Sequence, residues 1–534
     1  MFKFKTQFAE DIFKAKYQNK KNGCSTWPDL AYTLVGNVCS GLLEPYELTE
    51  LVDIITDMKF IPAGRYLYYA GRLVKYYNNC FAMIAEDTRE GWADLGYKHF
   101  MGLMCGGGIG TYYGKIRPNG SSISKTGGVA SGSLSLMHAM NEIGRNVQQG
   151  GSRRSALYAS LPYNHGDIIE FMYIKDWSEI LKDLKTRDFN FPAPLDMTNI
   201  SVVYDSLQSL DSKVFDVNVE QAMKSGEPGF SFNLNAVSEV GRNACSEFIT
   251  DTDSDLCNLG SLNFARIKDL DELARVTKLA SKFLVCGSIK ADLPYEKCKF
   301  VREQKRKIGL GIMGMHEWML QRGLPYGMSD ELTDWMGIYT LFSEIGADDV
   351  TSKHNISQCT RYRCIAPAGT ISIIASTTSG IEPLYSVATK RRYLKGDKWQ
   401  YQYIIDPLAQ QLINDGVDPD SIETSNDLSK DIERRIAFQA DVQDYVDMGI
   451  SSTLNLPAWG SEYNKESLIP NFSKCIKKYV PRLRGITCYP DGSRGGQPLT
   501  HVSYEEAKGQ EGLEFSEQLE FLSKTSCPSG ACGI

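Results

Sequence analysis

Leu103-Met-Cys-Gly-Gly-Gly-Ile-Gly110 is an apolar run that breaks into a cluster of glycines. Two further glycine-rich clusters follow at residues 127–132 and 148–154, and each precedes or follows another apolar run. Strands joined to helices by glycine turns produce this pattern. Because strands and helices alternate over most of the chain, we expect an α/β fold with largely parallel strands.

The chain on either side of this alternating region has a different texture. Residues 1–60 are typical of helix, because Leu48, Leu51 and Ile55 recur at helical spacing between acidic residues. Residues 505–526 are rich in Glu, Gln, Lys and Ser, which indicates a flexible, solvated linker. We therefore expect a helical segment at 1–60, an α/β unit at 61–504 and a flexible tail at 505–534.

The composition excludes several functional classes. A formal net charge of −7 argues against general binding to nucleic acid. The chain begins without the pattern of a secretory signal, and no apolar run approaches the ~20 residues that a membrane span needs. We expect a cytoplasmic protein (the host cytoplasm for a viral one), in which the 14 cysteines are mostly free thiols.

Two cysteines stand at the end of the predicted tail. Cys527 and Cys532 are separated by Pro-Ser-Gly-Ala, and only Gly533 and Ile534 follow them. Small, turn-forming residues allow two thiols to close into a disulfide, and a chain end is mobile enough to move between sites. The pair is therefore a candidate electron carrier. A pair of zinc ligands is the alternative, but zinc needs two further ligands and no second pair lies nearby.

Asn243-Ala-Cys-Ser-Glu247 is a second cluster of reactive residues. The alternation predicts that Asn243, Cys245 and Glu247 share one face of a strand. In one cavity the carboxylate can act as a general base, the amide can hold a hydroxyl and the thiol can react. Cys257 follows twelve residues later, in Cys-Asn-Leu-Gly-Ser. An ordinary polar loop with two cysteines is the alternative.

A third segment can present backbone N–H groups to a phosphate, because small residues and hydroxyls precede an apolar run. A common strand-to-helix turn is the alternative. By contrast, the glycines at 106–110 lack the spacing of a dinucleotide fingerprint, which excludes a nicotinamide cofactor. The residues of the third segment are Ala366, Pro367, Ala368, Gly369, Thr370, Ile371 and Ser372.

Taken in order, these segments resemble the catalytic subunits of ribonucleotide reductases, from about Asn79 to the C-terminus. The Asn243–Glu247 segment resembles the family's Asn-Pro-Cys-Gly-Glu motif, with departures at Ala244 and Ser246. The resemblance implies a ten-stranded α/β barrel of two five-stranded parallel half-sheets. It also implies a ribonucleoside-diphosphate reductase, which makes 2′-deoxyribonucleotides as DNA precursors.

The resemblance assigns a role to each reactive residue. Cys245 would carry a thiyl radical, Glu247 would be the base at the ribose 3′-hydroxyl, and Asn243 would position the ribose. Cys80, in Asn-Cys-Phe, and Cys257 match the pair that becomes a disulfide as the 2′-carbon is reduced. The tail cysteines match the shuttle that reduces this disulfide, with a thioredoxin- or glutaredoxin-like protein as the external reductant.

The resemblance also implies sites for nucleotides and for a second copy of the chain. Residues 366–372 resemble the family's Pro-Thr-Gly-Thr-Ile-Ser loop for the substrate phosphates, with Ala368 in place of a threonine. A specificity effector, a deoxynucleoside triphosphate or ATP, and a homodimer are expected. The effector residues implied are Asp87, Arg117, Gly151, Ser152 and Arg153.

Two sources of the radical are open at this point. The Ser-Gly-Ala-Cys-Gly-Ile end resembles the branch with a separate metal-bearing subunit, whereas residues 485–494 and Cys-Asn-Leu-Gly-Ser resemble the adenosylcobalamin branch. We favour a ferritin-like dimetal partner, no metal in this chain, and Tyr489 as a radical relay; a barrel-packing tyrosine is the alternative. Because only 79 residues precede Cys80, we expect no ATP-binding cone of the kind that regulates overall activity in the family. A thiol oxidoreductase that uses only the tail cysteines, or a non-catalytic nucleotide sensor, is the more distant alternative.

Overall fold

A computed structural model describes residues 2–147, 155–188, 191–234, 238–395, 398–493 and 499–516. The first half-sheet consists of five strands, each parallel to the next, and four of its five members are almost entirely buried. The strands are β2 (Cys80–Ile84), β3 (Gly108–Tyr112), β4 (Leu157–Pro162), β5 (Thr198–Tyr204) and β6 (Gly229–Phe232).

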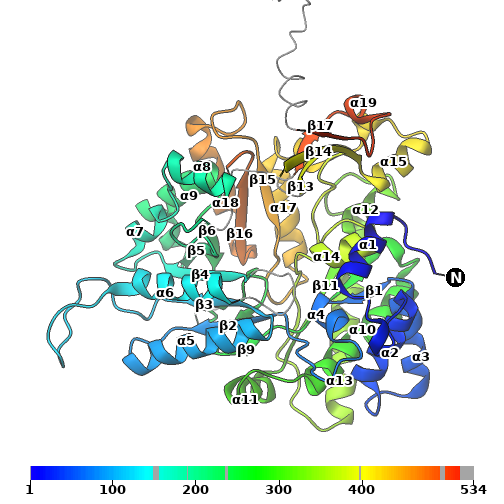
Figure 1. Cartoon of the computed structure of the whole chain (residues 1–534), viewed down its shortest axis with the longest axis horizontal. Coiled ribbons are helices and arrows are strands. Elements are labelled where there is room, and N and C mark those ends of the chain that lie inside the picture. The colour runs from blue at the N-terminus through cyan, green and yellow to red at the C-terminus, as the bar shows by residue number, and fades with distance from the viewer. Residues whose placement is uncertain are drawn as a thin grey trace, which may run out of the picture.

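Helices connect these strands and cover their outer face, where the apolar side chains of the strands are buried. Figure 1 shows them on one side of the molecule. Apart from the helix at residues 179–187, these helices contribute side chains to one hydrophobic core with the half-sheet. The helices are α5 (Arg89–Met104), α6 (Gly132–Asn146), α7 (Ile168–Tyr173), α8 (Glu179–Arg187) and α9 (Lys213–Ser225), with α18 (Ile469–Tyr479) beside α9.

A second set of five strands also pairs in parallel, and a bridge between Ile365 and Ile450 joins its two parts. The strands are β10 (Leu259–Asn263), β11 (Lys307–Met313), β12 (Arg361–Arg363), β15 (Thr453–Leu456) and β16 (Gly485–Pro490). β16 pairs antiparallel with β6, and β9 (Asp255–Leu256), which leads into β10, pairs antiparallel with β2. The predicted α/β fold class with parallel half-sheets is confirmed.

The N-terminal helices pack against the second half-sheet in a separate core, together with α10 and α13 (Figure 1). β1 (Phe60–Pro62) extends this half-sheet by pairing antiparallel with β10. The helices on this side are α1 (Gln7–Lys16), α2 (Trp27–Cys39), α3 (Pro45–Thr56), α4 (Gly64–Tyr69), α10 (Leu270–Lys290), α12 (Met315–Leu320) and α13 (Asp330–Lys353). By contrast, α11 (Glu296–Lys305) contacts β9 and contributes Cys298 to the core of the first half-sheet.

A small antiparallel sheet lies near the C-terminal end of the described chain (Figure 1). Its strands are β17 (Leu499–Val502), β13 (Ala388–Lys395), β14 (Lys398–Ile405) and β18 (Glu514–Ser516). The first part of the segment expected as a tail therefore pairs with β14. The remaining helices are α14 (Gly369–Ala375), α15 (Pro407–Asn414), α16 (Ser425–Leu428), α17 (Ile432–Gln443) and α19 (Tyr504–Ala507). No described helix has the length and apolar character to cross a membrane.

A short hairpin, β7 (Gly241–Arg242) and β8 (Ile249–Thr250), approaches the inner side of β2 and β3. A Cβ at Gly110 of β3 would lie 2.0 Å from the Arg242 carbonyl oxygen, so only glycine permits this approach. The residues between the two short strands form a turn, with Ser246 at a φ of 65°. The prediction that residues 243–247 form a strand was wrong, because the local hydrogen bonds described below close them into a turn.

Candidate active site

The turn at the tip of the hairpin is held by its own hydrogen bonds. The Asn243 side chain donates to Glu247 Oε1 (2.8 Å) and accepts from the Phe248 N–H (3.1 Å). Asn243 and Glu247 are almost fully buried, whereas Cys245 is only partly buried. The structure thus brings these three predicted residues together, although by a turn and not by strand alternation.

Burial has a direct consequence for the Glu247 carboxyl group. It raises the pKa of Glu247 to about 8; the nearby Cys80 thiol contributes, and the Asn243 hydrogen bond opposes the shift. The second carboxyl oxygen, Oε2, is buried and has no hydrogen-bond partner among the described residues. This oxygen can accept a proton from a substrate hydroxyl, as a general base must.

Two buried cations hold the two strands of the hairpin. On β7, the Arg242 guanidinium donates to Ser231 Oγ (3.1 Å) and to the Phe232 carbonyl oxygen (3.3 Å) of β6. On the β8 side, Lys307 Nζ donates to the Ile249 carbonyl oxygen (3.1 Å) and pairs with Asp255 at 2.8 Å. Both side chains of this ion pair are at most 5% exposed. The hairpin is therefore fixed to both half-sheets by polar contacts.

Cys80 and Cys257 face each other across the β2–β9 pairing. The register that pairs Phe81 with Leu256 places Cys80 opposite Cys257, whose N–H donates to the Cys80 carbonyl oxygen (3.0 Å). Directly opposite residues of an antiparallel pair have a Cα separation that a disulfide can span. Burial raises the pKa of Cys257 well above its usual range, and the neighbouring Cys80 thiol adds to the shift. The Cys257 thiol therefore remains protonated at neutral pH.

The predicted phosphate segment forms the start of α14. Ala368 has a left-handed φ of 54° and precedes Gly369, where the helix begins. The segment follows Ile365, whose N–H donates to the Gly449 carbonyl oxygen (3.1 Å); the Gly449 N–H donates in turn to the Glu247 carbonyl oxygen (2.7 Å). A short path of main-chain contacts thus connects this segment to the turn at residues 243–248.

The other predicted residues fall into three groups. Asp87 and Arg117 follow β2 and β3, and their side chains form an ion pair of 2.6 Å. Tyr489 lies on β16 opposite Asn455, and Cys488 before it is buried. Gly151, Ser152, Arg153 and both tail cysteines, Cys527 and Cys532, lie outside the described residues.

Sequence reasoning missed three residues that build the site, Arg242, Gly449 and Cys364, and it assigned no role to Lys307. Cys364 is fully buried in a small cluster with Cys80, Cys257 and Ala244 of the turn. Lysine at the start of the apolar run 308–313 was a usable signal, because a charge there must be paired. Gly449 carries no sequence signal, since its role depends on the approach of a distant carbonyl group.

The chain was compared with known protein families and relatives. The family model for the ribonucleotide reductase barrel domain matches residues 78–193, 210–341 and 357–477. A vitamin B12-dependent ribonucleoside-diphosphate reductase of Thermoplasma acidophilum is 26% identical, covering 91% of this chain and 72% of the relative. A Mycobacterium tuberculosis protein of the same name is also 26% identical, with 88% and 74% covered.

An adenosylcobalamin-dependent ribonucleoside-triphosphate reductase of Euglena gracilis is 23% identical over 85% of this chain and 67% of its own length. These relatives contradict the prediction of a dimetal radical source and a ferritin-like partner subunit, and they agree with the cobalamin alternative. The tail motif misled the prediction. Residues 485–494 and the Cys-Asn-Leu-Gly-Ser segment, which resemble the adenosylcobalamin branch, were the better guide. The chain belongs to the ribonucleotide reductase family, as a catalytic subunit.

Proposed function

We propose that this chain is an adenosylcobalamin-dependent reductase that converts ribonucleotides, with diphosphates as the first candidates, into 2′-deoxyribonucleotides. The observation that carries the proposal is the turn in which a partly buried thiol, Cys245, lies two residues from the buried carboxyl group of Glu247. The opposed thiols of Cys80 and Cys257 supply the reducing equivalents that this reaction needs.

The residues of the turn fit a cofactor that binds beside the turn and generates a radical on the exposed side of Cys245. Adenosylcobalamin, when bound, supplies the radical that removes the hydrogen atom of a thiol. Cys245 suits this step because it is the only one of the three proposed reaction-centre thiols that is not buried. Its thiyl radical would then abstract the hydrogen atom from the ribose 3′-carbon, while Glu247 Oε2 accepts the 3′-hydroxyl proton. Asn243 holds the carboxyl group in place through its 2.8 Å hydrogen bond.

Cys80 and Cys257 would complete the reduction. The 2′-hydroxyl leaves as water after it accepts a proton from this pair, and the two thiols become one disulfide. One ribonucleotide and two thiols thus give one deoxyribonucleotide, water and one disulfide. The raised pKa of Cys257 keeps its proton available for this step. We propose that Cys527 and Cys532 then reduce the disulfide by thiol exchange.

Nucleotide binding and the division of the chain are also proposals. Residues 366–372 would receive the substrate phosphates, a role supported by their main-chain path to Glu247. Asp87 and Arg117 would hold the specificity effector, together with residues 151–153, and a homodimer would form. We retain the helical segment 1–60, the catalytic barrel 61–504 and the tail 505–534 as functional parts.

An assay of the purified chain tests the proposal. The chain is incubated with adenosylcobalamin, a dithiol, an effector triphosphate and either CDP or CTP, and deoxycytidine products are measured by chromatography. We expect product with adenosylcobalamin and none with hydroxocobalamin, which lacks the adenosyl group. Product formation that requires an added metal-bearing subunit, with none from adenosylcobalamin, would contradict the proposal. The comparison of CDP with CTP identifies the substrate's phosphorylation level.

A further inference from the structure

Residues 445–451 lie between β12 and the catalytic turn. On one side, the Met448 N–H donates to the Arg363 carbonyl oxygen (3.1 Å). On the other side, the Gly449 N–H donates to the Glu247 carbonyl oxygen (2.7 Å). This segment therefore connects the strand that leads into residues 366–372 with the main chain of the proposed base.

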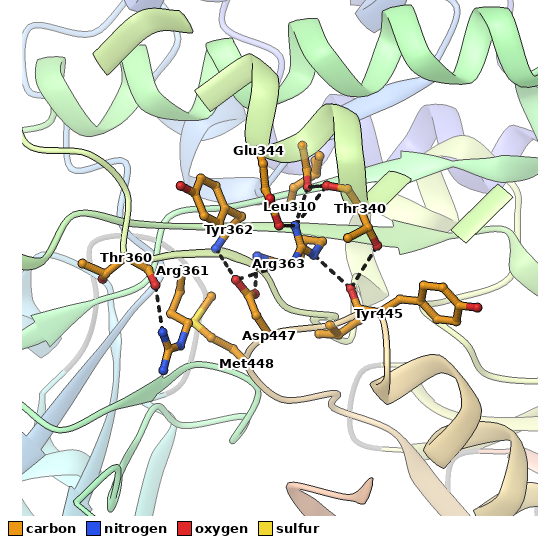
Figure 2. Close-up of polar contacts among 12 residues, drawn as sticks. Leu310, Thr340, Glu344, Thr360, Arg361, Tyr362, Arg363, Tyr445, Asp447 and Met448 are labelled. Atoms are coloured by element: carbon orange, nitrogen blue, oxygen red, sulfur yellow. Dashed lines mark hydrogen bonds and ion pairs between the residues drawn. The ribbon is translucent and has the colours of Figure 1, made fainter. Parts of the chain in front are cut away.

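Asp447 fixes this segment against β12, as Figure 2 shows. Its Oδ2 accepts from the Tyr362 N–H (2.9 Å) and its Oδ1 accepts from the Arg363 N–H (2.8 Å). One carboxylate thus binds two successive main-chain donors. Charge-assisted bonds of this kind are short and define the position of both partners.

Arg363 connects the same segment to α13 (Figure 2). Its side chain is about 6% exposed and donates to the Tyr445 carbonyl oxygen (2.9 Å), to Ser343 Oγ (2.8 Å) and to Glu344 Oε1 (2.8 Å). Its guanidinium group also lies 3.9 Å from the Asp447 carboxylate. A buried arginine with this many partners holds the segment at a defined distance from the helix.

The contact between this segment and the turn leaves no free space. A Cβ built on Gly449 would lie 3.0 Å from the carbonyl oxygens of both Ser246 and Glu247. Displacements of the segment are therefore transmitted directly to the turn, because close-packed groups cannot absorb them.

We propose that Asp447 and Arg363 are positioning residues. Together they hold the Glu247 main chain at a fixed position relative to the start of the phosphate segment. This proposal rests on the proposed function of Glu247 as the base. Neither side chain contacts the Glu247 carboxyl group in the described hydrogen bonds and ion pairs. Both act through residues 448 and 449.

We call the contacts of Asp447 and Arg363 with residues 445–449 the clamp. Loosening the clamp changes the environment of the Glu247 carboxyl group. The titratable groups around it are the thiols of Cys80, Cys257 and Cys364, and Cys245 lies on its own turn. Burial raises the pKa of the Cys257 and Cys364 thiols well above the usual range, and burial is also the largest cause of the raised pKa of Glu247. Entry of water would favour the ionised form and return the group toward ordinary carboxyl behaviour.

Asp447→Asn tests the clamp, because an amide oxygen can replace only one of the two acceptors. Asp444→Asn is the matched control: Asp444 is three residues away, half exposed, and pairs with Arg482 at 2.6 Å. Gly449→Ala is the second variant; it presses on the turn without a change of charge. The acid limb of the kcat–pH profile and an infrared titration of the Glu247 carboxyl band are measured, with Glu247→Gln to assign the band.

For Asp447→Asn and Gly449→Ala we expect the acid limb and the infrared midpoint to move about one unit to lower pH. We also expect kcat to fall about tenfold, because the base is misplaced. Asp444→Asn should change neither measurement. Unchanged midpoints in both folded test variants overturn the proposal, and Gly449→Ala decides alone if Asp447→Asn does not fold. If the parent chain makes no deoxyribonucleotide, the proposed function fails while the infrared titration, which needs no cofactor, still decides on the clamp.

Discussion

Cys245 and the Cys80–Cys257 pair belong to one candidate site, but different kinds of structure hold them. Cys245 lies on a turn between two strands of two residues each. Cys80 begins a five-residue strand, and the register of β2 with β9 sets its position relative to Cys257. Backbone hydrogen bonds between strands thus fix the Cys80–Cys257 pair, whereas side-chain hydrogen bonds and buried cations fix the turn.

This difference separates two demands on the protein. A reducing pair needs one fixed distance, because two thiols must approach closely enough to form a disulfide. The turn needs access on one side for the radical source and exclusion of water on the other side, around Glu247. A short inserted hairpin meets both demands, since one residue can be partly exposed while a residue two positions away is buried.

The largest expected effect comes from Cys245→Ser. The variant removes the thiol that the proposed reaction oxidises, so deoxyribonucleotide formation should fall below detection with every cofactor tested. Circular dichroism and effector binding should match those of the parent, because the residue is partly exposed and its replacement is similar in size. Retained deoxyribonucleotide formation would contradict the role proposed for the Cys245 thiol.

Glu247→Gln should lower kcat by about 10²–10⁴-fold, the usual range for a lost general base. In the parent, kcat should rise with pH up to about 8, because the base acts only when ionised. The variant should lose this rising limb. A parent profile that is flat between pH 6 and 9 would contradict the role of Glu247.

The same substitution has a consequence for stability. The folded-state pKa of Glu247 lies above its ordinary value of 4.5, so the stabilising contribution of this group is complete below that pH. The contribution is lost as the pH rises toward 8, because the unfolded chain ionises while the buried group resists. Glu247→Gln should therefore unfold at higher urea concentration than the parent at pH 8, and nearly alike at pH 4.5.

The sequence predicted the fold class and the identity of the reactive residues, but not how those residues are arranged. Glycine clusters and alternating elements correctly indicated an α/β fold, because local turn chemistry is visible in the residues themselves. Asn243, Cys245 and Glu247 were found, but their arrangement was wrong, since a turn closed by Asn243 also places alternate residues together. Gly449 contacts Glu247, about 200 residues earlier in the chain, and Asp447 contacts Tyr362, about 85 residues earlier. No local sequence pattern encodes contacts between segments this far apart.

The double variant Cys527→Ser with Cys532→Ser tests whether reduction of the Cys80–Cys257 disulfide requires the tail cysteines. With a protein reductant we expect about one turnover per chain and then a stall, because the internal disulfide has no thiol partner that can reach it. A small dithiol should restore turnover. Mass spectrometry of the stalled variant should find Cys80 linked to Cys257. Continued turnover with the protein reductant would show that it reaches the pair directly.

The smallest effect on turnover is expected at Lys307, which contacts both the hairpin and strand β9. Its ammonium group holds the Ile249 carbonyl oxygen of the hairpin and pairs with Asp255 of β9. Lys307→Met leaves the Asp255 carboxylate buried without its cation, which should lower the free energy of unfolding by about 3 kcal/mol. Urea denaturation measures this change.

Lys305→Met is the matched control, because Lys305 pairs with Asp251 near the surface, where both side chains are more than one-third exposed. Its loss should change stability by less than about 1 kcal/mol. Alkylation of the folded Lys307→Met variant then sharpens the comparison. If Lys307 holds the hairpin while the pairing of β2 with β9 holds Cys80 and Cys257, Cys245 should react several-fold faster and the other two thiols should not. Equal acceleration at all three thiols would mean that Lys307 supports the β2–β9 pair as well as the turn.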